Sequence, residues 1–225
     1  MPMIPPFPRW VWSWAAALPF AAGATNAIAL LALHHGGVTH LTGISTEGAI
    51  GIGTGNVALL LHAAAIMCFF TLGCMASAWT IRSARWARGR ACVAMLTMEG
   101  VLLVVAAHVL DGWPTVGTCL CALAIGLQNG ASSLVTGAVL RTSHVTGMFT
   151  DLGIALGQRL RGATYDGRRA RLCVVVIGTF IAGGIAGAAL ADAWTSRALW
   201  LPAAVVFAMA FTTGRRLDPL APASI

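Results

Sequence analysis

Residues 57–80 read VALLLHAAAIMCFFTLGCMASAWT, a run of 24 residues without Asp, Glu, Lys or Arg. A helix needs about 20 predominantly apolar residues to cross the roughly 30 Å of hydrocarbon in a bilayer. This stretch is long enough and apolar enough to span a membrane, and it predicts an all-α membrane protein.

The rest of the chain shares this composition. Of its 225 residues, 58% are hydrophobic and 9% are charged, whereas soluble domains carry about 25% charged residues. The mean hydropathy is +0.81. The chain has too little polar surface for a water-soluble domain, and the same composition excludes disorder, collagen and coiled coil. We expect a single membrane domain over residues 1–225, in contact with the lipid bilayer.

Six apolar stretches approach the length that a membrane span requires. They are Trp10–Leu33, Val57–Thr80, Ala91–Leu110, Thr115–Leu134, Leu172–Ala191 and Ala198–Thr213. Glu99 is the only formal charge in the six.

The basic residues predict the orientation of these spans. All fourteen are arginines, and twelve of them gather at Arg9, in residues 82–90, in residues 159–171 and at Arg215–Arg216. Short basic clusters between apolar runs are typical of the cytoplasmic loops of membrane proteins. The net charge of +7 therefore does not indicate a nucleic-acid partner. If all four groups are cytoplasmic, both termini are cytoplasmic. Only Arg197 then departs from the rule that basic residues of membrane proteins lie on the cytoplasmic side.

Two polar segments, His35–Asn56 and Val135–Leu160, cannot be full spans in this arrangement, because the arginine clusters would then lie on opposite sides. We interpret each as a re-entrant half-helix that dips into the membrane and returns to the same face. Irregular backbone is tolerated at this depth only when protein or a water-filled cavity surrounds it.

The two re-entrant segments are similar in sequence. Residues 39–53 (THLTGISTEGAIGIG) and 143–157 (SHVTGMFTDLGIALG) are identical at six of fifteen positions. The chain thus divides into one repeat at about residues 10–110 and a second at about residues 115–213. Each repeat has three spans, which is an odd number, so the two are expected to be inverted relative to each other. Inverted repeats with broken helices are common in transporters.

At this level the chain resembles the YoaK family of bacterial inner-membrane proteins. The resemblance rests on Asn26–Ala27 and the H-L-T-G of His40–Gly43 in the first half, and on Gln128–Asn129 and the segment Thr142–Gly153 in the second. It implies a six-span protein of the bacterial inner membrane whose function is uncharacterised.

The repeated pattern T-G-x-x-T-[ED] predicts a helix start. Thr42 and Thr146 are plausible N-caps, and the first backbone N–H groups of a helix bind anions or polar solutes. Two inverted helix starts would bring such groups together near the midplane. The alternative is that both motifs only cap buried helices. The residues predicted to bind the solute are Asn26, His40, Thr42, Gly43, Thr46, Asn129, His144, Thr146, Gly147 and Thr150.

Three acidic residues, Glu47, Asp151 and Glu99, are predicted to couple protons to transport, because carboxylates inside a membrane are usually functional. His40 and His144 have three open interpretations. They can relay protons or contact solute, they can bind a metal together with the carboxylates, or they can only bond backbone at the kink. No tight pair of ligands supports the metal site, and we assign no metal and no cofactor.

The amides of Asn26 and Asn129 lie within predicted spans and need hydrogen-bond partners. We expect each to pack against the re-entrant tip of the opposite half, as pore lining or as a link between helices. Gly183-x-x-x-Gly187 suits close helix packing, either within the chain or between protomers, so a homo-oligomer is compatible with the sequence.

These features favour a secondary transporter or channel for a small polar or anionic solute, with coupling to protons. The alternative is a membrane enzyme or lipid-headgroup-binding protein that uses the same His and carboxylate side chains. A purely structural or assembly role is a third interpretation. The chain has no nucleophile motif and no Walker A or Rossmann pattern, which argues against an enzyme.

Overall fold

The structure is a computed structural model that describes residues 8–33, 37–81 and 89–215. All the elements in these ranges are helical, as the sequence predicts. They are α1 (Arg9–Leu33), α2 (Leu41–Thr54), α3 (Val57–Thr80), α5 (Arg90–Val109), α6 (Pro114–Thr136), α7 (Val145–Leu160), α8 (Gly167–Trp194), the 3-10 helix η1 (Thr195–Leu199) and α9 (Trp200–Arg215). His35, the arginines of residues 82–88 and Arg216 lie outside the described residues.

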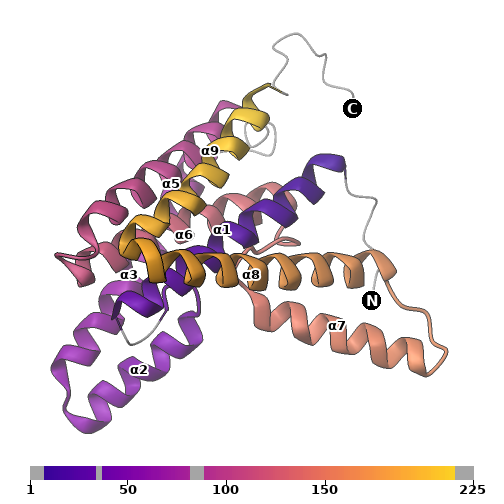
Figure 1. Ribbon diagram of the computed structural model, residues 1–225. Helices are drawn as coiled ribbons and strands as arrows, with labels where there is room; N and C mark the ends of the chain where they lie inside the picture. The colour runs from indigo at the N-terminus through magenta and orange to yellow at the C-terminus, as the bar shows by residue number, and fades with distance from the viewer. Residues whose placement is uncertain (1–7, 34–36, 82–88, 216–225) are drawn as a thin grey trace.

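Within the described ranges, five apolar segments are long enough to cross a membrane. Four of them coincide with α1, α3, α5 and α6, and the fifth covers residues 167–215. This last segment contains α8, η1 and α9, and the chain changes direction at η1 (Figure 1). The protein is therefore an all-α, multi-pass membrane protein. The sequence predicts two spans within this fifth segment, and the second of them corresponds to the 16-residue α9.

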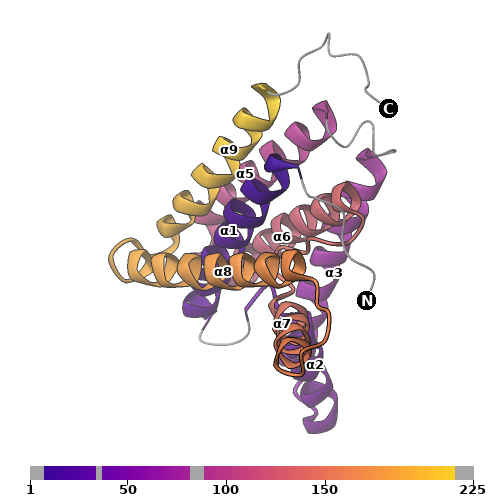
Figure 2. The ribbon, with the colours of Figure 1, turned by 90° about the vertical axis from the view of Figure 1, so that its right-hand side faces the viewer.

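The two predicted half-helix segments contain the short helices α2 and α7, of 14 and 16 residues. Each forms a hairpin with the helix that follows it, because α2 packs on α3 and α7 packs on α8. Both short helices begin toward the middle of the molecule and extend away from it (Figure 1, Figure 2). Their starting residues are thus held by the central helices, while their far ends project.

Two close helix crossings hold the central helices together. Where α1 crosses α8, Gly23 lies against the carbonyl oxygen of Phe180, and Gly183 lies against that of Phe20. Where α6 crosses α3, Gly126 lies against the carbonyl oxygen of Phe70, and Gly73 against that of Leu123. Any side chain at these glycines would collide with backbone. Small residues allow membrane helices to approach this closely.

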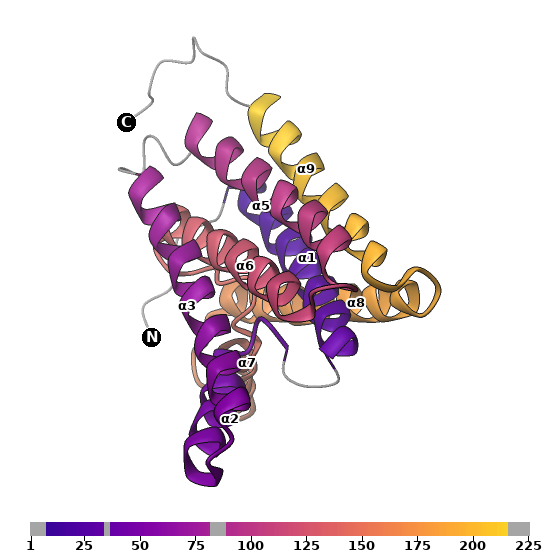
Figure 3. The same cartoon turned by 90° about the vertical axis from the view of Figure 1, so that its left-hand side faces the viewer.

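The same crossings are visible from two sides of the molecule, with α8 across α1 in Figure 2 and α3 beside α6 in Figure 3. Gly187 packs against Ala24 of α1. The Gly183-x-x-x-Gly187 motif therefore serves a contact within the chain, which is one of the two uses that the sequence allowed.

The core is formed mainly by α1, α5 and α6, and α8 and α9 add further buried residues to it. The α5 helix packs against both α6 and α9, and the Phe207 ring of α9 covers Gly100 of α5. In contrast, α3 buries only 17% of its most apolar window inside the chain. The remaining apolar surface of α3 is suited to contact with lipid.

Candidate functional site

The repeated H-x-T-G motifs adopt the same local structure at the starts of α2 and α7. His40 and His144 are the N-cap residues of these helices. The His40 ring lies over Gly43, so that a Cβ at Gly43 would be 2.5 Å from Cδ2 of His40. The His144 ring covers Gly147 in the same way, with Nδ1 2.7 Å from the corresponding position. The glycine in each motif therefore makes room for the imidazole.

An asparagine from a central helix holds the residue before each histidine. The Oδ1 atom of Asn26 in α1 accepts a hydrogen bond of 3.1 Å from the backbone N–H of Thr39. The Oδ1 atom of Asn129 in α6 accepts one of 3.3 Å from the N–H of Ser143. Each amide thus fixes the start of the short helix in its own half. The prediction that each asparagine packs against the opposite tip is wrong, because Asn26 bonds to Thr39 and Asn129 bonds to Ser143, which precede the short helix of the same half.

The second of these attachments has more hydrogen bonds. Asn129 also donates from Nδ2 to Ser143 Oγ, at 2.8 Å, and to the Ile125 carbonyl, at 3.0 Å. Its neighbour Gln128 donates from Nε2 to Thr142 Oγ1, at 2.6 Å, and to the carbonyl of Leu18 in α1, at 2.9 Å. Gln128 therefore connects the start of α7 to the first half of the chain.

The predicted N-caps are wrong by two residues. The helices begin at Leu41 and Val145, so Thr42 and Thr146 lie inside the first turn. Neither His40 nor His144 caps its helix with a side-chain hydrogen bond. The first N–H groups of α2 and α7 are therefore not capped by the side chain of the residue that precedes the helix, which leaves them available to a solute.

The threonines of the two motifs bond to their own helices. The Thr46 hydroxyl donates to the Thr42 carbonyl at 3.0 Å, and the Thr150 hydroxyl donates to the Thr146 carbonyl at 3.1 Å. All four threonines are exposed on the surface of the chain. Because Thr46 and Thr150 have already used their hydroxyl protons, these two oxygens can only accept a hydrogen bond from a solute.

The two acidic residues of the motifs differ in their partners. Asp151 forms an ion pair with Arg169 of α8, in which Oδ2 accepts from Nη2 at 2.6 Å and from Nε at 3.1 Å. Glu47 has a buried Oε2 atom with no hydrogen-bond partner among the described residues. The side chains are therefore not equivalent, although their sequence positions correspond.

The residue three positions after the cap of α3 and of α8 accounts for the different partners of Glu47 and Asp151. Asn56 caps α3 by accepting from the N–H of Leu59, and Asp166 caps α8 by accepting from the N–H of Arg169. Leu59 and Arg169 thus occupy the same position after their caps. The hairpin of α2 and α3 has a leucine where the hairpin of α7 and α8 has the arginine that neutralises Asp151.

Glu99 lies in α5 and is 1% exposed. Both of its carboxyl oxygens lack a hydrogen-bond partner in the part of the chain that the structure describes. No described residue therefore offsets the high cost of burying a charge at this position.

The profile of a family described as "Protein of unknown function (DUF1275)" matches residues 14–212, which is most of the chain. The protein belongs to the DUF1275 family. This match confirms the resemblance to the YoaK-like membrane proteins. No curated protein and no solved structure matched the chain.

In this DUF1275 protein, the structure brings each predicted binding residue of one half together with others of the same half. His40 and Asn26 both lie against Gly37, and Asn129 contacts the residue before His144. Over the described residues, no three His, Cys, Asp or Glu side chains are grouped as a metal site would require.

Sequence reasoning missed three residues that organise this region of the DUF1275 chain. Arg169 was interpreted only as part of a topology cluster, although it neutralises Asp151. Gln128 and Thr142 entered only through the family resemblance, although they form a buried hydrogen bond. A polar Gln-Asn pair inside an apolar span was the available signal, because such side chains need partners in a membrane.

Proposed function

We propose that this protein is a secondary transporter or channel for a small polar or anionic solute, coupled to protons. The observation that carries the proposal is the matched pair of helix starts, in which a histidine stacks on a glycine and the first turn has no side-chain cap. Open N–H groups at a helix start bind anions and polar groups without a cationic side chain.

The proposal includes two inverted repeats, over about residues 10–110 and 115–213, in six spans with both termini in the cytoplasm of a bacterial inner membrane. Several observations support the repeats. The crossing of α1 with α8 and the crossing of α6 with α3 use glycines in reciprocal positions. Asn26 and Asn129 also make corresponding hydrogen bonds, in which the side-chain Oδ1 accepts from the backbone N–H of the residue before the histidine. The arginine clusters support the orientation.

In this mechanism the solute binds at the exposed first turns of α2 and α7, where His40, Thr42, His144 and Thr146 present polar atoms. The protons are carried by Glu47 and Glu99, since neither has an ionic partner among the described residues. Asp151 differs because Arg169 neutralises it.

The test uses purified protein in liposomes, with chloride, nitrate, sulfate and phosphate as anion probes and urea as a neutral probe. A pH-sensitive dye reports proton movement, and light scattering reports urea uptake. We expect at least one probe to move faster than in empty liposomes. His144→Ala and Glu47→Gln should lower that flux by about tenfold or more, as expected when a coupling or binding group worth about 1.4 kcal/mol is lost.

Gly178→Ala is the matched control, because a Cβ at this position of α8 meets no atom within 4 Å. It should leave the flux unchanged. If every probe crosses at the rate of empty liposomes, or if His144→Ala and Glu47→Gln transport as the wild type does, the transport proposal is wrong.

A further inference from the structure

A polar pocket lies beside the turn from α8 to α9. It has a volume of about 540 Å³, within the range of about 300–1,000 Å³ usual for ligand sites. It is lined by Asp111, Ala193, Trp194, Thr195, Arg197 and Trp200. None of these residues belongs to the site proposed above.

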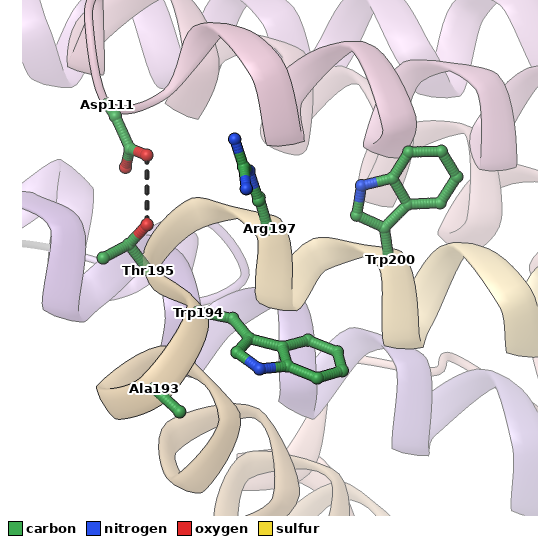
Figure 4. Close-up of a pocket in the computed structure, with 6 residues that line it drawn as sticks. All are labelled: Asp111, Ala193, Trp194, Thr195, Arg197 and Trp200. Carbon is green, nitrogen blue, oxygen red and sulfur yellow. Dashed lines mark hydrogen bonds between the residues drawn. The ribbon is translucent and has the colours of Figure 1, made fainter.

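The pocket contains a carboxylate in a fixed position. Oδ2 of Asp111 accepts hydrogen bonds from Thr195 Oγ1, at 3.1 Å, and from Ser196 Oγ, at 2.8 Å. These bonds hold the acid at the edge of the pocket (Figure 4). The sequence places Asp111 between the α5 and α6 helices, so the two hydroxyls also tie this turn to η1.

Arg197 supplies a positive charge to the pocket. Its side chain is exposed and forms no ion pair with any residue in the described ranges. Figure 4 shows the side chain extending between the Asp111 carboxylate and the Trp200 indole. The pocket therefore presents two opposite charges that are separated from each other, with open volume between them.

Two tryptophans complete the pocket. Trp194 and Trp200 are 57% and 47% exposed, and the Trp200 ring meets the His108 ring edge to face at 5.7 Å. Indoles are enriched where a membrane meets water, and their faces attract ammonium groups. The tryptophans thus fit a ligand that has a cationic amine and lies at the membrane surface.

The position of the pocket along the helices agrees with a site at the membrane surface. Arg90 and Arg215 lie where α5 begins and α9 ends, and Val93 and Gly214 lie close together at that end. Arg197 lies at the opposite end, where α5 has ended and α9 has not begun. The pocket is therefore at the boundary of the apolar helices, which is the level of lipid headgroups.

We propose that this pocket binds a zwitterionic phosphate–amine group of the phosphoethanolamine type, as carried by a phospholipid. Arg197 would bind the phosphate, since a guanidinium matches two phosphate oxygens. Asp111 and the tryptophan faces would bind the amine. Neither charge alone explains the pocket, because an anionic ligand would be repelled by the fixed carboxylate and a cationic one by the guanidinium.

The experiment is native mass spectrometry of the full chain in detergent, with equal amounts of phosphatidylethanolamine and phosphatidylglycerol added. We expect the wild type to retain phosphatidylethanolamine preferentially. Arg197→Gln should reduce the retention of both lipids by about fivefold or more. Asp111→Asn keeps an oxygen for the two hydroxyl bonds and should abolish the preference for the zwitterionic lipid. Arg215→Gln is the matched control for loss of one arginine, and it should retain lipid as the wild type does.

Soluble O-phosphoethanolamine and inorganic phosphate, titrated by calorimetry, separate the two sources of this chemistry. Binding of the lipid together with weak or no binding of the soluble compound supports a lipid headgroup. Binding of O-phosphoethanolamine as strongly as the lipid supports the zwitterion and overturns the lipid source. The proposal as a whole is overturned if Arg197→Gln retains lipid like the wild type, or if the wild type shows no preference between the two lipids.

Discussion

The side chains of Glu47 and Asp151 lie at corresponding positions of a repeated sequence, yet of the two only Asp151 has an ionic partner among the described residues. The ion pair of Asp151 with Arg169 is partly shielded, with exposed side-chain fractions of 16% and 34%. Hydrogen bonds between charged groups contribute about 1.5–3 kcal/mol when they are not fully solvated. This pair therefore fastens α7 to α8, and the hairpin of α2 and α3 has no equivalent fastening.

Removing either partner should lower the stability of the folded protein by about 1–3 kcal/mol. We expect Asp151→Asn and Arg169→Gln each to lower the midpoint of thermal unfolding in detergent, measured by fluorescence-detected gel filtration. The double variant should lose little more than either single variant, because both changes remove the same interaction. Effects that simply add would show that the pair contributes nothing.

The two asparagines should also differ in their contributions. Asn129 is 8% exposed and bonds to the Ser143 N–H, the Ser143 hydroxyl and the Ile125 carbonyl. Asn26 makes its hydrogen bond to the Thr39 N–H. We expect Asn129→Ala to cost about 1–3 kcal/mol and Asn26→Ala about 1 kcal/mol, in the same unfolding measurement. An equal loss for the two variants would contradict this order.

At this scale the sequence predicted which residues matter better than it predicted their contacts. The pairing of His40 with Gly43 follows from a three-residue spacing that is visible in the motif, but the direction of the ring is not. The partner of Asn129 depended on how the loop from α6 to α7 returns, and only tertiary structure determines that. Arg169 was hidden because a basic residue near a span is usually explained by topology alone.

Among the elements, the glycine crossings are the strongest constraint on packing. At Gly126, a methyl group would collide with the Phe70 carbonyl oxygen, and at Gly23 with that of Phe180. Backbone cannot move aside as a flexible side chain can, so a larger residue must separate the helices. Overpacking of this kind costs about 1–3 kcal/mol and occasionally more.

Gly126→Ala and Gly23→Ala should therefore destabilise the protein by at least about 1–3 kcal/mol. Gly178→Ala should be neutral or stabilising, because alanine is a better helix former than glycine by about 1 kcal/mol. The test is the unfolding midpoint of the purified protein in detergent, with the three variants compared side by side. A Gly126→Ala variant as stable as Gly178→Ala would show that the crossing of α3 with α6 is looser than the structure has it.

The long apolar elements were the most predictable part of the fold. The span expected at Val57–Thr80 is α3 with the same bounds, and the span expected at Trp10–Leu33 is α1 with one more residue. Continuous hydrophobicity defines such helices without reference to their neighbours. The short helices were placed less well, because α2 and α7 begin at residues whose first turn has no capping side chain to mark it.

In the whole molecule, segments that are distant in sequence come together at the two ends of the helices. Asp111 meets Thr195 and Ser196 at one end of the helices, and Gly214 lies near Val93 at the other. The turn after α5 and the turn before α9 therefore lie at the same end of the helices. The orientation predicted from the arginines places that end outside the cytoplasm.

Cysteine accessibility in intact cells tests this orientation. Gly112→Cys and Ala193→Cys should react with a membrane-impermeant maleimide added from outside, because both positions are exposed and adjoin the same pocket region. Arg215→Cys should react only after the cells are opened. The wild type, with its six cysteines in apolar helices, gives the background. Labelling of Gly112→Cys and Arg215→Cys from the same side would overturn the topology.

The glycine crossings also have a mechanical consequence. A contact between two backbones has no rotamers to exchange, and close-packed interiors deform little. Each crossing therefore holds its two helices rigidly, so that α1 and α8 move as one rigid pair and α3 and α6 as another. Any motion that would open the centre of the molecule alternately to the two sides of the membrane must then occur between these two pairs. The two pairs are connected where α5 packs on α9, with the Phe207 ring on Gly100, and where Gln128 of α6 donates to the Leu18 carbonyl of α1. At both places a side chain sets the distance.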